Sequence, residues 1–236
     1  MTHTIRPTPV ASTRHTLIIL GIIFVITSFS ARRTGGSPIA AAGSSHLTQY
    51  GVLLAGEWLL FFGVWRGLKA HGTSISSIFG EVSRTRRGRV IALAGGVGAL
   101  PIIRLTAFAT RQGLIQFGAP VAADAAGVQT AMAPHGFLES LLWIALSISA
   151  GVCEEFVFRG YLIKQFSAWL GGPLPGLLLS ALVFGLGHAY QGPWQVILIT
   201  LAYGVPLGAL ALLARGLGPS IVAHSLEDII SGLTGV

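Results

Sequence analysis

Two adjacent carboxylates, Glu154 and Glu155, are the residues of this chain whose type and position point most directly to chemistry. They follow an apolar run over residues 137–148 that is hydrophobic enough to enter a bilayer. An ionised carboxylate in such surroundings is expensive to bury, so each one needs a partner or a function. The sequence therefore predicts that other apolar segments bring partners to this pair.

Helical spacing predicts different roles for the two carboxylates. Arg159 lies four residues after Glu155 and hence on the same helix face, so we expect these two to form an acid–base pair that offsets the burial of both charges. Glu154 is rotated by about 100° from this face and has no partner on its own helix. Behind Glu154 lies a strip of small residues that lets another helix come close: Ser147, Ala150 and Gly151. Glu154 is thus the candidate general base.

Two further segments carry candidate partners. His188 ends an apolar run with Phe184 one turn before it, and His224 and Asp228 share a helix face in the last apolar segment. Imidazoles and a carboxylate can together hold a water or a metal ion such as zinc, which makes His188, His224 and Asp228 candidate metal ligands. A glutamate beside that water can take its proton, as in metal-assisted or glutamate-based peptide hydrolysis.

Each of these features can also be explained by a structural role without any catalytic function. A histidine at a helix end is usually an interfacial residue, and a His–Asp pair four residues apart is often a hydrogen-bonded structural pair. Glu57, inside another apolar segment, is either a hydrogen-bonded structural carboxylate or a secondary site residue. The occurrence of three such motifs on separate apolar segments of one chain favours a common site.

The composition indicates a membrane protein. Of 236 residues, 52% are hydrophobic and only 10% are charged, against roughly a quarter in a soluble domain, and the mean hydropathy is +0.73. The net charge of +7 does not suggest a nucleic-acid partner, because the basic residues lie between apolar runs. Membrane lipids are the expected surroundings. The single cysteine, Cys153, excludes an intramolecular disulfide and a cysteine-based zinc cluster.

The apolar segments predict an all-α, polytopic transmembrane helical bundle of seven or eight membrane helices. We expect a flexible arm over residues 1–15 and one transmembrane domain over residues 16–236, with its catalytic core at about 137–232. The predicted spans cover residues 17–28, 50–68, 90–109, 137–169, 176–189, 194–213 and 217–233. Gly171 to Pro175 should end the long fourth helix, and Pro206 should kink the sixth.

The basic residues predict the orientation. They concentrate in the N-terminal arm, in the 66–89 loop, in residues 159–175 and at Arg215, which the alternation of spans puts on one side. The positive-inside rule makes that side cytoplasmic, with the N-terminus in and the C-terminus out. We therefore expect an integral, multi-pass protein of a bacterial or archaeal cell membrane. On this topology His188 lies a few ångströms deeper than Glu154 and His224, unless the fourth helix tilts or the fifth starts late.

The three motifs resemble those of the CPBP family, also called Abi, of intramembrane proteases. The family includes the type II CAAX prenyl endopeptidase and bacterial proteins linked to bacteriocin processing or self-immunity. Its Glu-Glu-x-x-x-Arg pattern matches Glu154 to Arg159, its Phe-x-x-x-His pattern matches Phe184 and His188, and its His-x-x-x-Asn/Asp pattern matches His224 and Asp228. The last position is Asp here, where Asn is more familiar. The resemblance covers roughly residues 137–232.

The resemblance implies an endopeptidase that cleaves a membrane-associated protein or peptide, either CAAX-type and prenylated or bacteriocin-like. It implies that Glu154 activates the attacking water with help from His188. It further implies that His224 and Asp228 bind a metal or stabilise the oxyanion, and that Glu155 and Arg159 hold the site together. The metallo and glutamate mechanisms both stay open, because the His-Glu-x-x-His helix of many zinc proteases is absent.

Three other functions compete with this one. A proton-coupled transporter would use the same polar residues as a relay, although the hydropathy shows no inverted repeat. An immunity protein would keep the scaffold without the activity, although every motif residue is present. A haem protein with His188 and His224 as axial ligands would place three carboxylates beside the cofactor, which suits it poorly.

Overall fold

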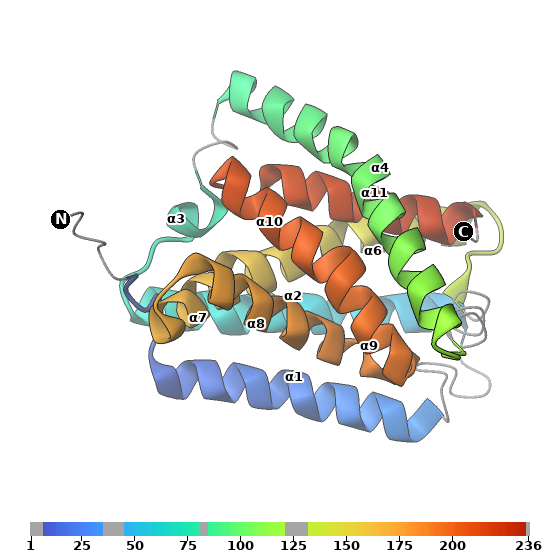
Figure 1. The fold of residues 1–236 in the computed structure, drawn as a ribbon, viewed down its shortest axis with the longest axis horizontal. Coiled ribbons are helices and arrows are strands. Elements are labelled where there is room, and N and C mark those ends of the chain that lie inside the picture. Colours follow the sequence, from blue (N-terminus) through green and yellow to red (C-terminus); the bar gives the residue numbers. More distant parts are fainter. Residues whose placement is uncertain (1–6, 35–44, 81–84, 121–131, 235–236) are drawn as a thin grey trace.

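The computed structural model describes residues 7–34, 45–80, 85–120 and 132–234, and over these residues the chain is helical, without β-strands (Figure 1). This confirms the all-α class. The elements are, in order, α1 (Thr13–Thr34), α2 (His46–Ala70), α3 (Ile75–Phe79), α4 (Arg86–Gln116), α6 (Phe137–Glu154), the π-helix η1 (Glu155–Leu162), α7 (Ile163–Leu170), α8 (Pro173–Gly187), the 3₁₀ turn η2 (Ala189–Gln191), α9 (Pro193–Ile199), the π-helix η3 (Thr200–Gly204), α10 (Val205–Ala214) and α11 (Gly218–Thr234).

Four helical segments among the described residues are long and apolar enough to cross a membrane. They are His46–Ala70, Arg86–Gln116, Phe137–Leu170 and Pro193–Ala214. Two shorter apolar helices, Thr13–Ser28 and Pro173–Gly187, match the first and fifth expected spans in position. Four spans fit an integral membrane protein, whereas the count of seven or eight stays a prediction.

The fourth predicted span is one continuous helical segment whose hydrogen bonding changes at the carboxylates. α6 ends at Glu154, η1 begins at Glu155, and α7 carries the helix on to Leu170. In a π-helix each N–H bonds five residues back rather than four, so the turn is wider, and such segments are frequent at functional sites. The helix then ends at Gly171, whose φ of 80° is the left-handed conformation that glycine adopts most easily. The predicted break is thereby confirmed.

The sixth predicted span is also interrupted by a π-helix. α9, η3 and α10 follow one another without a break, and η3 ends two residues before Pro206. A proline inside a helix removes one backbone N–H and clashes with the preceding turn, which the wider π turn relieves. The irregularity expected at Pro206 therefore takes the form of a local widening.

The segments that the sequence places on the cytoplasmic side meet at one end of the bundle (Figure 1). The side chain of Gln165 accepts hydrogen bonds from the backbone N–H groups of Val10 and Ala11, at 3.0 and 3.1 Å. The Leu217 N–H donates to the Phe79 carbonyl at 3.0 Å. The described part of the N-terminal arm is thus held against α7, and α1 already begins at Thr13, inside the predicted arm.

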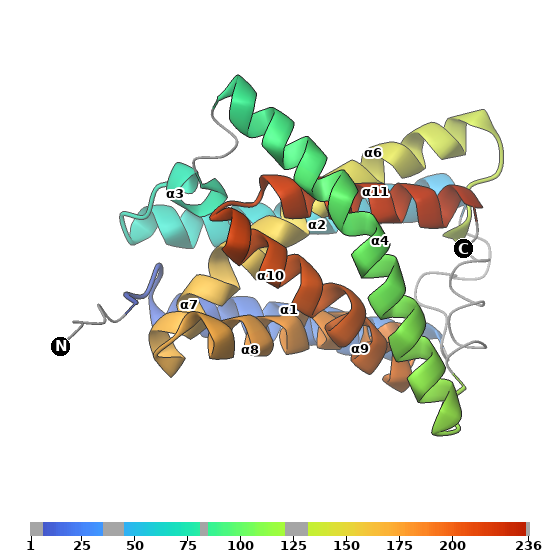
Figure 2. The same cartoon turned by 45° about the horizontal axis from the view of Figure 1, so that its top comes forward.

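Small residues allow α11 to pack closely between α4 and α6. A Cβ added to Gly151 of α6 would lie 2.1 Å from the Ser225 Oγ and 3.1 Å from the Ile221 carbonyl oxygen. A Cβ added to Gly96 of α4 would lie 2.5 Å from the Val222 side chain. α4 crosses α11 in both views of the molecule (Figures 1 and 2). The predicted role of the strip behind Glu154 is thereby confirmed at Gly151.

We expect Gly151→Ala to lower the free energy of unfolding by about 1–3 kcal/mol, because the methyl group forces α11 away from α6. Gly98→Ala on α4 is the matched control, since a Cβ there meets nothing within 4 Å. This control should be neutral or stabilising by up to about 1 kcal/mol. Unfolding in detergent, followed by circular dichroism, measures both. Equal stability of the two variants would contradict the close contact.

Candidate active site

Glu155 and Arg159 form the buried ion pair that their spacing predicts. The Arg159 Nη1 lies 2.8 Å from the Glu155 Oε1, and the two side chains are 1% and 0% exposed. Nη1 is not aligned for a hydrogen bond, so the contact is mainly electrostatic. The guanidinium also donates from Nη2 to the Tyr203 carbonyl at 3.4 Å and lies 4.2 Å from the centroid of the Phe184 ring. These contacts offset the desolvation of both charges.

Glu155 has a second partner that its helix spacing does not show. The His224 Nδ1 donates a hydrogen bond to the same Glu155 Oε1 at 2.8 Å. The two residues are 69 positions apart, on η1 and α11, and no local pattern links them. A carboxylate on one ring nitrogen fixes the orientation of an imidazole. Glu155 therefore orients His224 in addition to pairing with Arg159.

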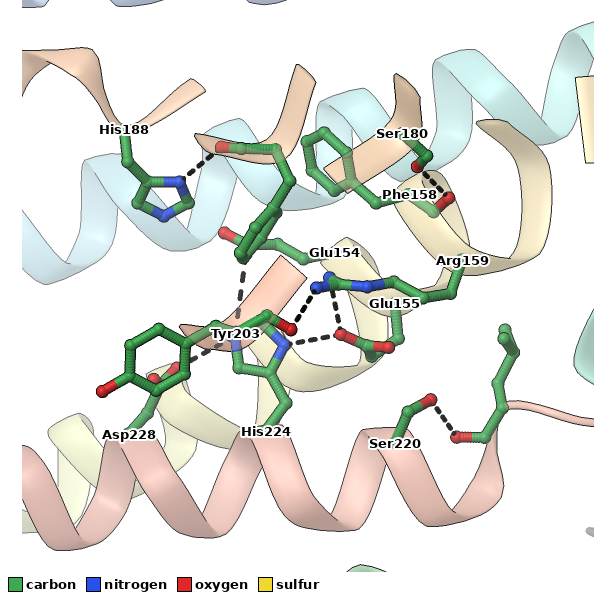
Figure 3. Close-up of polar contacts among 12 residues, drawn as sticks. Glu154, Glu155, Phe158, Arg159, Ser180, His188, Tyr203, Ser220, His224 and Asp228 are labelled. Carbon is green, nitrogen blue, oxygen red and sulfur yellow. Dashed lines mark hydrogen bonds and ion pairs between the residues drawn. The ribbon is translucent and has the colours of Figure 1, made fainter. Parts of the chain in front are cut away.

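The other ring nitrogen of His224 faces the two remaining carboxylates (Figure 3). The His224 Nε2 lies 3.7 Å from the Glu154 Oε2 and 3.6 Å from the Asp228 Oδ2. Both separations exceed a direct hydrogen bond, and a water that contacted both atoms of either pair would lie beside the line that joins them. The Glu154 and Asp228 side chains are 23% and 36% exposed, whereas Glu155 is fully buried.

His188 stands at the end of α8, next to the site (Figure 3). Its Nδ1 lies 2.8 Å from the Phe184 carbonyl oxygen, which can only accept, so Nδ1 carries a proton and Nε2 of the neutral ring is free to accept one. The Phe184 ring contacts both histidines, with centroid separations of 4.7 Å to His188 and 6.0 Å to His224. His188 and His224 thus contact the same aromatic ring, although the predicted topology places His188 a few ångströms deeper in the membrane.

The three candidate metal ligands do not form a metal-holding group in this arrangement. Across the described ranges, no three His, Cys, Asp or Glu side chains are grouped as a metal site requires. His188 and His224 both contact the Phe184 ring, and no ion pair or hydrogen bond links the two among the described residues. A zinc site needs its ligands within about 2.0–2.3 Å of one point.

α11 is tied to its neighbours on both sides of His224. The Trp143 Nε1 donates to the Asp228 carbonyl at 2.9 Å, which joins α11 to α6. The Arg104 Nε donates to the Glu227 Oε2 at 2.9 Å, which joins α11 to α4. Arg104, inside an apolar span, is thus paired rather than only extended toward the membrane surface. These contacts hold the register of the helix that carries His224 and Asp228.

One comparison identifies this part of the chain. Residues 136–230 match the family model described as Type II CAAX prenyl endopeptidase Rce1-like. This segment belongs to the Rce1-like family. The matched range contains Glu154, Arg159, His188, His224 and Asp228, and it agrees with the predicted core at about 137–232. No curated protein and no solved structure matches the chain.

The Rce1-like match confirms the family that the three motifs resemble. It supports peptidase activity on a membrane-associated protein in general, because the family is one of endopeptidases. The helices before residue 136 lie outside the matched range.

We expect Arg159→Met to lower the free energy of unfolding by about 3–5 kcal/mol, because it leaves Glu155 buried without its cation. The double variant Glu155→Gln/Arg159→Met should recover part of this loss, since no unpaired charge remains. Arg104→Met is the control: this arginine is 37% exposed, and its loss should cost less. Denaturant unfolding in detergent gives all three values. Equal losses for the two arginines, or no recovery in the double variant, would contradict this account.

Proposed function

We propose that the chain is an intramembrane endopeptidase that hydrolyses a peptide bond of a membrane-associated protein or peptide. One observation carries the proposal. The partly exposed Glu154 carboxylate faces the His224 Nε2 across 3.7 Å, and the buried Glu155–Arg159 pair holds that histidine from behind. This is a base next to an oriented imidazole, and both groups can contact a water that lies beside them. The Rce1-like match and the membrane-spanning helices agree with it.

Glu154 acts as the general base in this mechanism. A water bonded to the Glu154 carboxylate attacks the peptide carbonyl carbon, and its proton passes to that carboxylate. The new C–O bond moves the carbonyl electron pair onto oxygen. Collapse of this tetrahedral intermediate breaks the C–N bond, and Glu154 returns the proton to the leaving nitrogen. His188, with Nε2 available as an acceptor, helps to orient the water.

His224 stabilises the charge that develops on the carbonyl oxygen. Glu155 holds its Nδ1, which aims Nε2 at the reacting centre, and a protonated Nε2 donates to the oxyanion there. Asp228 lies on the same side at 3.6 Å and supports the protonated ring. The pair of adjacent glutamates therefore divides into one base and one group that positions the imidazole.

The proposed substrate is held at the membrane by its own lipid or apolar segment. The Rce1-like family name points to a prenylated CAAX-type protein, and the wider resemblance to a bacteriocin-like peptide. Farnesylated and unmodified versions of one peptide, offered in proteoliposomes, distinguish these two classes. A chelator added in parallel tests whether the reaction also depends on a divalent metal.

We expect Glu154→Gln and His188→Gln each to lower the cleavage rate by about 10²-fold or more, because the first removes the base and the second removes the imidazole that orients the water. Glu139→Gln is the matched control: it lies on the same helix, α6, and contacts His46 rather than the site. The readout is new peptide ends in a membrane proteome incubated with each purified variant, with unfolding measured alongside.

Full activity of Glu154→Gln would overturn the mechanism. No new peptide ends with the unaltered protein would favour the non-catalytic immunity protein. Substrate flux in proteoliposomes without new ends would favour the proton-coupled transporter.

We further propose that the end of the bundle carrying the N-terminus is cytoplasmic, as the basic residues indicate. Ser74→Cys at that end should be protected from a membrane-impermeant maleimide in intact cells, and Ser45→Cys at the start of α2 should be labelled. Both serines are exposed helix caps, and the native Cys153 is buried, so it gives little background. The reverse labelling pattern would invert the topology.

A further inference from the structure

A polar cavity opens where α1 begins and α2 ends, outside the Rce1-like match. Both views place these two helix ends together, at the end of the bundle that carries the N-terminus (Figures 1 and 2). The volume of the cavity is about 220 Å³, against roughly 30 Å³ for one water in the liquid, so it holds a group larger than a single water. It is lined by Ser12, His15, Arg66, Gly67, Ala70 and His71.

The first turns of α1 pack on a glycine of α2 to form one wall of this cavity. A Cβ added to Gly67 would overlap the His15 imidazole, so this ring lies directly on the α2 backbone. The His15 ring also contacts the edge of the Tyr161 ring, with 6.2 Å between the centroids. The Tyr161 hydroxyl is in turn 2.7 Å from the Thr16 Oγ1. His15 is thereby fixed in place, and the shape of the cavity with it.

The cavity presents donor groups that no acidic side chain neutralises. Arg66 and His71 are exposed, and neither side chain forms an ion pair or a hydrogen bond within the described part of the chain. The Ser12 Oγ accepts a hydrogen bond from the His15 N–H at 3.2 Å, which leaves its own hydroxyl proton to donate. The carboxylates that form ion pairs contact other bases: His46, Arg104, Arg159 and His224.

These donors fit a phosphate group. A guanidinium presents several N–H groups in a planar fork that matches two phosphate oxygens at once, and an imidazole and a hydroxyl add further donors. The described residues supply no anion for Arg66, so its counter-ion comes from outside the protein.

Neighbouring side chains place the cavity at the level of the lipid headgroups. Beyond it, α1 and α2 carry exposed large apolar side chains, among them Leu17, Ile18 and Phe62. Next to it, the Lys69 Nζ lies 5.3 Å from the centroid of the exposed Trp65 ring. Tryptophan rings and long basic side chains collect where the apolar part of a membrane meets its headgroups. The polar cavity thus follows directly on an apolar, lipid-facing surface.

We propose that this cavity binds the phosphate group of an anionic phospholipid at the seam between α1 and α2. The Arg66 guanidinium pairs with the phosphate oxygens, the Ser12 hydroxyl and the His71 ring donate to them, and the acyl chains lie along the apolar faces of the two helices. Basic cavities between membrane helices bind anionic lipid headgroups by this chemistry. The bound lipid ties α1 to α2, and none of these residues belongs to the candidate active site.

Native mass spectrometry of the full-length protein in an uncharged detergent tests the proposal, because it counts the lipids that stay bound. Phosphatidylglycerol, which is anionic, should bind more tightly than phosphatidylcholine, whose choline cation offsets its phosphate. Arg66→Gln should weaken the binding of phosphatidylglycerol by about tenfold or more, because a charge-assisted contact is lost. Arg66→Lys should restore part of it, since the charge returns without the fork. His71→Gln should weaken the binding as well.

Arg86→Gln is the matched control. It removes the same charge from another exposed arginine, at the start of α4, which does not line the cavity. This variant should bind phosphatidylglycerol as the unaltered protein does. Equal weakening in Arg66→Gln and Arg86→Gln, or equal binding of the two lipids, would mean a diffuse effect of surface charge and would overturn the proposal.

Thermal unfolding separates a lipid from a free phosphate. Phosphatidylglycerol should raise the apparent Tm of the unaltered protein and of Arg86→Gln, and it should raise that of Arg66→Gln less. Inorganic phosphate at millimolar concentration should leave the Tm of the lipid-free protein unchanged. Equal stabilisation by inorganic phosphate would mean that the cavity takes a soluble phosphate and would overturn the lipid assignment. Cleavage is no part of either readout, so the failure of the endopeptidase proposal would leave both tests intact.

Discussion

A single buried oxygen atom, the Glu155 Oε1, joins the two helical segments on which the site depends. It lies 2.8 Å from the Arg159 Nη1 on its own helix and 2.8 Å from the His224 Nδ1 on α11. A buried carboxylate persists in a membrane protein only when such partners offset its desolvation. The contacts that offset the desolvation of Glu155 therefore also orient His224 toward Glu154 and Asp228. Stability and the geometry of the candidate reaction rest on one interaction.

Two π-helices contribute groups to the surroundings of the buried Glu155–Arg159 pair. Arg159 lies in the π-helix η1, and the Tyr203 carbonyl that it contacts lies in the π-helix η3. The π-helix η1 therefore provides the guanidinium of the ion pair, and the π-helix η3 provides the carbonyl oxygen that accepts a hydrogen bond from it. On the opposite side, Gly151 lets α11 approach α6 until backbone and side chain are in contact. A Rce1-like site of this kind is thus assembled from wide turns in two segments and a close crossing in a third.

Neighbouring carboxylates of the same type have different chemistry because their surroundings differ. Glu155 is fully buried and contacts both Arg159 and His224, whereas Glu154 is partly exposed and faces an imidazole nitrogen. Burial without a partner favours the protonated form of a carboxyl group, and a nearby cation favours the ionised form. These two environments support the separate roles proposed for the pair, a positioning group and a base.

Several features follow from the sequence alone. The hydrophobic composition predicts the membrane class, the four-residue spacing predicts the Glu155–Arg159 pair, and the three motifs carry the family resemblance, because these are properties of local spacing. Only the tertiary structure decides the hydrogen bond between Glu155 and His224 and the contact of the Phe184 ring with both histidines. These contacts join segments far apart in the chain. Helix packing and register set them, and no local pattern encodes either.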